Sequence, residues 1–385
     1  MSLSTDINTR AFFALLRAGL WEQDARLPEC DHVDFMKVYK LAAEQTVVGL
    51  IAAGLEHTPN TRPAQNQTLA IVGETLRLEQ RNKAMNLFIE KLVGTFDVNG
   101  IQSVLVKGQG IAQCYERPLW RTCGDVDWLL NEENYVKAKK LLIPKASSIE
   151  EEVAIEKHIG MTLDSWIVEL HGSLQTCVLP RMDKVISEVQ SEIFDNLQVR
   201  KWDSNGITII LPEANNDIIL IFTHILKHFF KGGIGLRQIC DWCRLLWTFK
   251  DSLDYELLEA RLKRAGLLTE WKAFAALAVG WLDYPKDSMP LYNSNKKWTK
   301  KAEKILTIII ETGNLGHNRN ISSCHNQGFF SRKLASLRQH VRDSIRLMFI
   351  FPLDTIRATW GNFIYSINWM INVERVVSLR KTGSQ

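Results

Sequence analysis

The 385-residue sequence has no apolar run near the length of about 20 residues that a membrane-spanning helix requires. It also has no low-complexity tract, and residues 1–9 are polar, which predicts no signal peptide there. The net charge of +4 is too small to indicate nucleic-acid binding over the whole surface. These absences leave an ordinary globular protein as the expectation.

Cysteine is present, but without the regular pairing of a disulfide scaffold. The seven cysteines are odd in number and irregularly spaced, which favours free thiols in a reducing compartment. We therefore predict a cytoplasmic protein. Hydrophobic residues make up 46% of the chain and charged residues 23%, and the length allows two or three domains.

The most informative stretch lies between residues 103 and 130. The apolar run 103–106 predicts a short buried strand, which the sequence Lys-Gly-Gln-Gly at 107–110 interrupts. A short helix is expected over 111–116, ended by Pro118, because a proline disfavours helical geometry in the residue before it. A second strand is expected over 125–130.

Two aspartates, Asp125 and Asp127, open that second strand. Side chains alternate across a strand, so both carboxylates share a face, with Cα atoms about 6.5–7 Å apart. Adjacent carboxylates raise one another's pKa unless a cation lies between them. Mg²⁺ prefers oxygen ligands and substrate phosphates, so the spacing predicts a Mg²⁺ (or Mn²⁺) site. Two solvated aspartates at an exposed strand end are the alternative, since Asp-x-Asp is a common pattern.

A third carboxylate is expected from a β-hairpin over 158–163 and 166–171. Glu169 lies among apolar neighbours in the strand 166–171 of this hairpin, and a charged side chain in such a place needs a partner. It would be the third metal ligand, or else a glutamate at an open hairpin edge. Asp164 is the second candidate, although its place in the turn favours a structural role.

The stretch resembles the polymerase-beta-type nucleotidyltransferase superfamily and is more closely similar to its bacterial uncharacterised nucleotidyltransferase branch. The matching residues are Lys107, Gly108, Ala112, Tyr115, Pro118, Arg121, Gly124, Asp125 and Asp127. The resemblance continues at 168–171, is weaker at His224 and at 236–241, and covers roughly residues 100–250. One departure is Gly108-Gln109 in place of the usual glycine-serine turn, which removes a hydroxyl that helps to hold the triphosphate.

The resemblance implies transfer of a nucleoside monophosphate from ATP or another nucleoside triphosphate to an acceptor hydroxyl, with Mg²⁺ or Mn²⁺ as cofactor. Asp125, Asp127 and Glu169 would be the catalytic residues and metal ligands, with Glu169 also the candidate general base. The nucleotide would bind to Lys107, Gly108, Gln109 and Arg121. The cleft would also include His171, His224, Arg237 and Asp241. The acceptor is unknown.

Several of these residues have simpler explanations. Lys107-Gly108 could be a plain strand-to-helix turn with a solvated lysine. Arg121 could hold Asp127 in place, and either Arg117 or Arg121 could form a salt bridge with a nearby glutamate. Tyr115 and Trp120 could stack on a base or simply pack in the core.

The helical half of the chain contains a possible zinc motif. His224 and His228 are one helical turn apart, as are Cys240 and Cys243, so the four side chains have the types that zinc takes. Residues 235–250 are also apolar enough for a core helix, in which small buried cysteines are common.

The fold class that we predict is α+β, with a small mixed sheet between helical regions. The expected domains are a helical N-terminal region 1–98, a nucleotidyltransferase-like core 99–212 and a helical C-terminal domain 213–385. Beyond the elements above, a strand is expected over 206–211 and a mobile loop over 313–328. Helices are predicted over 6–20, 32–57, 65–98, 131–145, 182–194, 217–231, 235–250, 254–265, 267–283, 298–312 and 329–350.

The segment 331–385 is basic, with interleaved aromatic residues. It could contact an anionic membrane surface or nucleic acid, but a helix with a solvated basic face explains it as well. Two rivals to the enzyme therefore stay open. One is an inactive nucleotide-binding or interaction module of the same fold, and the other is a membrane-surface accessory protein.

Overall fold

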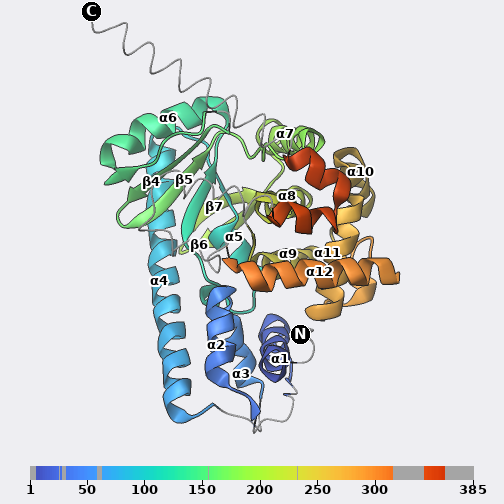
Figure 1. Ribbon diagram of the computed structural model, residues 1–385. Helices are drawn as coiled ribbons and strands as arrows, with labels where there is room; N and C mark the ends of the chain where they lie inside the picture. Colours follow the sequence, from blue (N-terminus) through green and yellow to red (C-terminus); the bar gives the residue numbers. More distant parts are fainter. Residues whose placement is uncertain are drawn as a thin grey trace, which may run out of the picture.

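The computed structural model describes residues 6–25, 27, 32–58, 63–154, 156–231, 233–314 and 342–359 (Figure 1). Most of the predicted loop 313–328 and most of the basic segment 331–385 lie outside these ranges. The described chain is a mixed α+β structure with one five-stranded sheet and a separate two-stranded sheet, so the predicted fold class is confirmed. Among the described residues, no helix is both long and apolar enough to cross a membrane.

The N-terminal region is helical, as predicted. Its elements are α1 (Ile7–Trp21), α2 (Phe35–Glu44), α3 (Val48–Glu56) and α4 (Gln65–Val98). In Figure 1, α4 runs the length of one side of the molecule, from the first three helices to the sheet.

The prediction of one helix over 32–57 is wrong, because the chain breaks between α2 and α3. Thr46 at the break has a positive φ of 56°. The preceding residue, Gln45, is fully buried and reaches the C-terminal helices: its Oε1 accepts from the Leu236 N–H at 3.0 Å, and its Nε2 donates to the Ile309 carbonyl at 3.2 Å. Contacts with distant helices therefore override a continuous apolar pattern.

The main sheet has the strand order β1-β2-β5-β4-β3. Its strands are β1 (Val104–Val106), β2 (Asp125–Leu129), β3 (Ser148–Ile149), β4 (His158–Leu163) and β5 (Trp166–His171). β2 and β5 are parallel, and the other neighbours are antiparallel. The mixed sheet and the β4–β5 hairpin are as predicted.

The connections around β2 begin at different residues from those predicted. α5 (Gly108–Ala112) starts directly after β1, earlier than the predicted 111–116, with Gly108 at φ +37°. Pro118 does not end this helix but opens a short 3-10 turn, Pro118–Trp120. After β2, α6 (Glu132–Leu142) begins as expected at Asn131, whose side chain accepts from the Asn134 N–H at 2.9 Å.

The two-stranded sheet pairs β6 (Val199–Ser204) with β7 (Ile207–Pro212). Only β7 was predicted; β6 has the sequence VRKWDS, which lacks a clear alternation of apolar and polar residues. The remaining helices are α7 (Pro180–Asp195), α8 (Ala214–Lys231), α9 (Leu236–Phe249), α10 (Tyr255–Ala265), α11 (Leu268–Trp281) and α12 (Lys296–Thr312). Within the predicted helix 329–350, the described helical part covers 342–348, and a further helical segment covers 352–359.

Two hydrophobic cores hold these elements together. One joins α1–α3 to α7–α12, so helices from both ends of the chain share it. The other lies between the main sheet, α4 and α6 and includes fully buried Trp128, which meets Phe96 of α4 edge to face at 5.3 Å. The domain boundaries at residues 98 and 212 stay a prediction.

One acidic residue lies inside the first core and gives stability a pH dependence. Glu270 in α11 is fully buried, and burial, helped by the neighbouring Asp354 carboxylate, raises its pKa to about 9. The folded protein therefore keeps a proton that the unfolded chain releases near pH 4.5, so the free energy of unfolding should fall as the pH rises from about 4.5 to 9.

We expect Glu270→Gln to flatten this dependence. The slope that one such group contributes is up to about 1.4 kcal/mol per pH unit, measurable by urea unfolding between pH 5 and 9. Glu303→Gln, at an exposed position on α12, is the matched control and should keep the wild-type slope. A Glu270→Gln protein with the same slope as wild type would contradict the assignment.

Candidate functional site

Three acidic side chains meet on one face of the main sheet. In the parallel pair of β2 and β5, Asp127 lies opposite Glu169 and Asp125 lies opposite Ile167. Side chains at aligned positions of neighbouring strands point to the same side, and so do those two residues apart along one strand. Asp125, Asp127 and Glu169 therefore share a face, which is the arrangement that a three-carboxylate site needs.

The neighbouring carboxylates perturb the pKa of Asp125. The charge of Asp127, with burial and the charge of Glu169, raises the pKa of Asp125 to about 6. Lys107 partly offsets this negative charge, since its Nζ lies 2.7 Å from Asp127 Oδ1. Burial lowers the pKa of the Lys107 ammonium, but the nearby carboxylates outweigh burial and raise it. Lys107 is therefore a built-in cation beside the acidic cluster.

Two histidines adjoin the carboxylates from the hairpin. His171 Nε2 lies 2.8 Å from Asp127 Oδ1 and 3.4 Å from Glu169 Oε2, and His158 Nε2 lies 3.2 Å from the same Glu169 oxygen. Burial would raise the pKa of Glu169, but the hydrogen bonds from both histidines lower it. His158 was not among the predicted site residues. The hairpin register pairs it with His171, so the predicted turn already implied their proximity.

A cavity of about 180 Å³ lies against this cluster. It brings together nine predicted site residues, namely Lys107, Gly108, Arg121, Asp125, Asp127, Glu169, His224, Arg237 and Asp241. The helices α8 and α9 form its other wall. The cavity thus joins the sheet to α8 and α9, whose lining residues come more than 50 positions later in the chain.

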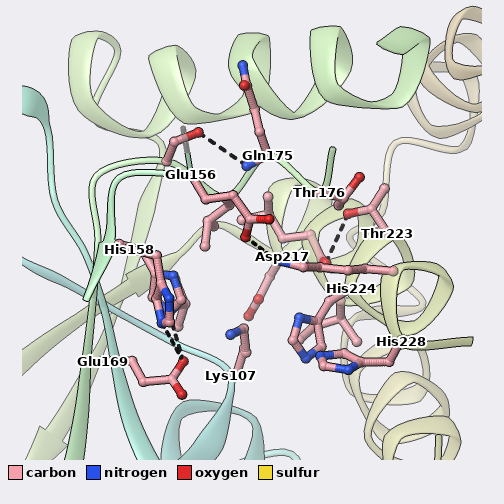
Figure 2. A pocket seen from close by; sticks show the side chains of 17 residues that line it. Lys107, Glu156, His158, Glu169, Gln175, Thr176, Asp217, Thr223, His224 and His228 are labelled. Carbon is pink, nitrogen blue, oxygen red and sulfur yellow. Dashed lines mark hydrogen bonds and ion pairs between the residues drawn. The ribbon is translucent and has the colours of Figure 1, made fainter. Parts of the chain in front are cut away.

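A second cavity of about 200 Å³ adjoins the first, and the two share Lys107, Glu169, His224 and His228 (Figure 2). His171 and His158 line it from the sheet. In Figure 2, the two α8 histidines face His158 across the cavity. Burial lowers the pKa of His224 well below its usual value and that of His228 to about 4, so both imidazoles are neutral at pH 7.

Arg121 and Asp241 form a buried ion pair that joins the core to α9. Arg121 Nε and Nη2 donate to the two Asp241 oxygens at 2.9 and 2.7 Å, and the Tyr115 hydroxyl donates to Asp241 at 2.8 Å. Burial would raise the pKa of Asp241, but the Arg121 charge outweighs it and lowers that pKa. The side-chain partner of Arg121 is therefore an aspartate 120 residues away, and neither Asp127 nor a nearby glutamate.

Arg237, predicted to line the cleft, and Gln109, predicted to bind the nucleotide, point to different surroundings. Arg237 is partly open, 20% exposed, and its Nη1 lies 3.8 Å from Asp241. Gln109 is buried, and its side chain donates to Asn82 Oδ1 of α4 at 2.9 Å, so it is turned towards α4.

Outside the cavities, Arg117 and Asp164 form ion pairs, whereas Trp120 is partly exposed and does not pack in the core. Arg117 pairs with Glu22 at 2.9 Å and Glu56 at 2.7 Å. Trp120 donates from Nε1 to Glu79 at 3.0 Å. Asp164 lies in the hairpin turn and pairs with Lys91 at 2.6 Å.

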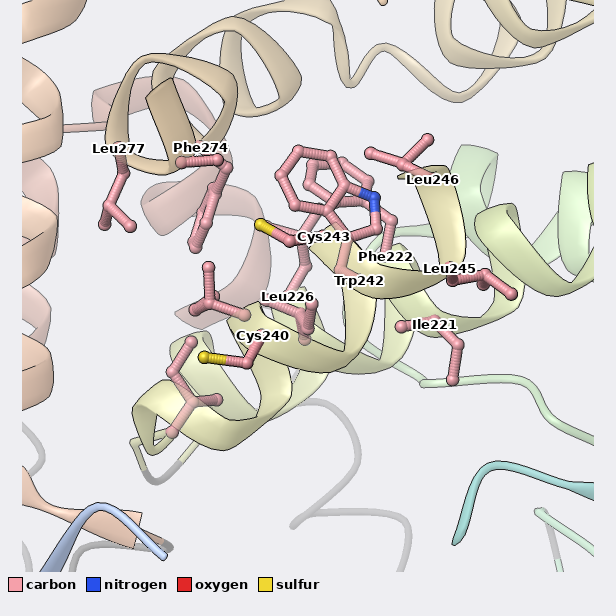
Figure 3. Close-up of a cluster of buried hydrophobic side chains, with 14 of the residues drawn as sticks. Ile221, Phe222, Leu226, Cys240, Trp242, Cys243, Leu245, Leu246, Phe274 and Leu277 are labelled. Carbon is pink, nitrogen blue, oxygen red and sulfur yellow. The ribbon is translucent and has the colours of Figure 1, made fainter. Parts of the chain in front are cut away.

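The possible zinc motif does not assemble. Cys240 and Cys243 are fully buried in the first hydrophobic core, and Figure 3 shows them beside Leu226, Phe274 and Leu277. His224 and His228 instead face the cavities. The cysteines are therefore core residues, and their burial raises the pKa of both thiols.

A mixed sheet that presents three carboxylates to a cavity beneath a helical region is the architecture expected of a nucleotidyltransferase. The chain belongs to the family described as uncharacterised nucleotidyltransferase, which it matches over residues 31–283. Family and site together support a nucleotidyltransferase role in general terms.

Other comparisons add little. No curated protein gives a significant match. A crystal structure described as an antigenic nucleotidyltransferase-like protein from Paracoccidioides brasiliensis is 15% identical, with a TM-score of 0.31, over 52% of this chain and 92% of that chain. At that TM-score, the similarity supports no further conclusion.

Proposed function

We propose that the protein is a cytoplasmic, metal-dependent nucleotidyltransferase of the polymerase-beta type. It would move a nucleoside monophosphate from ATP or another nucleoside triphosphate to an acceptor hydroxyl, releasing pyrophosphate. The observation that carries the proposal is the convergence of Asp125, Asp127 and Glu169 on one cavity with Lys107, Gly108 and Arg237.

The acidic cluster fits Mg²⁺ or Mn²⁺. Its donors are carboxylate oxygens, and the raised pKa of Asp125 reflects more negative charge than Lys107 alone neutralises. Asp125, Asp127 and Glu169 would hold the ion. When bound, it would neutralise the phosphates and lower the pKa of the acceptor hydroxyl.

The chain's own cations would bind the triphosphate. Lys107 and the partly open Arg237 line the first cavity from opposite walls, and Gly108, which also lines it, has no side chain to block a phosphate. A guanidinium contacts phosphate with two donors at once, which fixes its orientation. Lys107 would contact the phosphates, while Asp125, Asp127 and Glu169 would hold the ion.

The second cavity would hold the acceptor. It borders Glu169 and is lined mostly by polar side chains, among them Gln175, Thr176 and Thr223. The neutral imidazoles of His224 and His228 can accept a hydrogen bond from an acceptor hydroxyl. Glu169 has a lowered pKa, which suits a permanently charged ligand better than the general base that its position suggested.

The test is incubation of the full chain with each nucleoside triphosphate, labelled on the α-phosphate, and Mg²⁺ or Mn²⁺. Label is then sought on the protein, on RNA and in a small-molecule extract. Transfer of label supports the enzyme. Tight nucleotide binding without any transfer would instead favour an inactive binding module.

Arg237→Ala should weaken nucleotide binding by roughly 10–100-fold, because a hydrogen bond to a charged group contributes about 1.5–3 kcal/mol. The fold should survive, since Arg237 is partly exposed, its contact with Asp241 is long, and the variant otherwise loses a single hydrogen bond, from Arg237 Nε to Thr46 Oγ1 at 3.2 Å. Calorimetry with a non-hydrolysable triphosphate measures the change. Arg117→Ala removes an arginine that pairs with Glu22 and Glu56, and it should bind as wild type does. Equal affinity in the two variants would show that the phosphates lie elsewhere.

A further inference from the structure

The side of Glu169 that faces the second cavity differs in chemistry from the side that faces Asp125. His158 and His171 are directly opposite each other on β4 and β5, and their rings stack with centroids 4.7 Å apart. Both Nε2 atoms lie near the same carboxylate oxygen, Glu169 Oε2, at 3.2 and 3.4 Å. Figure 2 shows His158 beside Glu169. Two nitrogen donors and one oxygen donor therefore converge on one point.

The spacing of these atoms suits a shared ion. One ligand atom from each of His158, Glu169 and His171 can be chosen so that all three lie within 4.8 Å of one another. Metal–nitrogen and metal–oxygen bonds to zinc are about 2.0–2.2 Å, so an ion between such atoms can reach all three after small side-chain shifts. A second carboxylate is adjacent, because Asp127 Oδ1 lies 2.8 Å from His171 Nε2.

The cluster is also accessible. The side chains of His158 and Glu169 are 21% and 26% exposed, and all three residues line the second cavity. An ion could therefore enter from the cavity and keep open positions on that side. Three protein ligands with an open position are the pattern of catalytic rather than structural metal sites.

We propose that His158, His171 and Glu169 form a second cation site that takes a transition-metal ion of the Zn²⁺ class and not Mg²⁺. Imidazole nitrogen suits Zn²⁺, Fe²⁺ and Ni²⁺, whereas Mg²⁺ prefers oxygen donors and water. Glu169 has two carboxylate oxygens, so it can serve this site and the Asp125–Asp127 site together. The position of the ion beside the acceptor cavity, but not its binding, rests on the proposed function.

The first experiment is zinc X-ray absorption on the wild-type full chain, loaded with one equivalent of Zn²⁺ in excess Mg²⁺. The expected spectrum shows imidazole scattering from two histidines and no sulfur ligand. Oxygen-only or sulfur ligation, or displacement of Zn²⁺ by Mg²⁺, would overturn the proposal. This measurement needs no variant, so it does not depend on how a substitution folds.

Calorimetric Zn²⁺ titration then assigns the ligands. We expect His158→Ala to weaken binding by more than about 100-fold, since even outer-shell partners of metal ligands contribute about 10–100-fold. His57→Ala removes another histidine that pairs with a glutamate, Glu22 at 2.7 Å, and should leave Zn²⁺ affinity unchanged. Equal affinity in the two variants would contradict the site.

The Asp125→Asn variant and two wild-type outcomes distinguish failure of the metal site from failure of the proposed function. The variant should keep its nitrogen-ligated Zn²⁺, because the three proposed ligands do not include Asp125. If wild type binds Zn²⁺ through histidine but never transfers a nucleotide, the proposed function fails and the metal site stands. If nucleotide is transferred but Zn²⁺ has no histidine ligand, the metal site fails and the function stands.

Discussion

Replacing Asp241 with alanine should lower the free energy of unfolding by about 3–5 kcal/mol, because the change leaves a buried guanidinium without its counter-charge. The Arg121 side chain is only 4% exposed and gives two hydrogen bonds to Asp241. The Tyr115 hydroxyl loses its acceptor in the same change. Urea unfolding at pH 7 measures the effect, and the midpoint should fall without a change of slope.

Two variants calibrate this result. Tyr115→Phe removes one neutral donor to Asp241 and should cost about 1 kcal/mol. Asp251→Ala makes the same substitution at an exposed aspartate of the same helical region and should change stability by less than about 0.5 kcal/mol. If Asp241→Ala resembles Asp251→Ala, the ion pair does not hold α9 against the core.

Asp125→Asn should reduce nucleotidyl transfer by at least about 100-fold. The metal ion that Asp125 would hold stabilises the developing charge by several kcal/mol, and 1.36 kcal/mol is a factor of ten in rate. The substitution keeps the size of the side chain and removes its charge. Because Asp125 is partly exposed at the start of β2, the far-ultraviolet circular dichroism spectrum should not change.

The rate is measured with the labelled triphosphate that the screen identifies, and Mn²⁺ binding is followed by calorimetry. Asp164→Asn is the control, since Asp164 pairs with Lys91 in the hairpin turn. It should keep both activity and Mn²⁺ binding. An Asp125→Asn protein that transfers nucleotide as fast as wild type would remove Asp125 from the catalytic site.

Local features of the fold could be predicted from local sequence. The alternation around Asp125 and Asp127 placed β2 correctly, and the turn at 164–165 placed the β4–β5 hairpin correctly. The long helix α4 was predicted with its observed bounds, 65–98. In each case the signal lies within a few residues of the structure that it predicts, as strand and helix periodicity require.

Features that depend on distant partners could not be predicted in this way. No local pattern indicates that β2 pairs with β5 in parallel, which is what places Glu169 beside Asp127. The resemblance supplied that neighbour. Nothing near Arg121 in the sequence shows that its partner is Asp241, and the simplest expectation was a phosphate or a nearby glutamate. The break after Gln45 likewise depends on contacts with α9 and α12.

The hydrogen bond from Gln45 to a residue far along the chain has a consequence for synthesis on the ribosome. Its carbonyl partner, Ile309, comes 264 residues later in the chain. At about 5–20 residues per second, that partner is made roughly 13–53 s after Gln45. During this interval the apolar residues of α1 and α3 lack the C-terminal helices that share their core. We expect the nascent N-terminal helices to depend on chaperones until translation has passed α12.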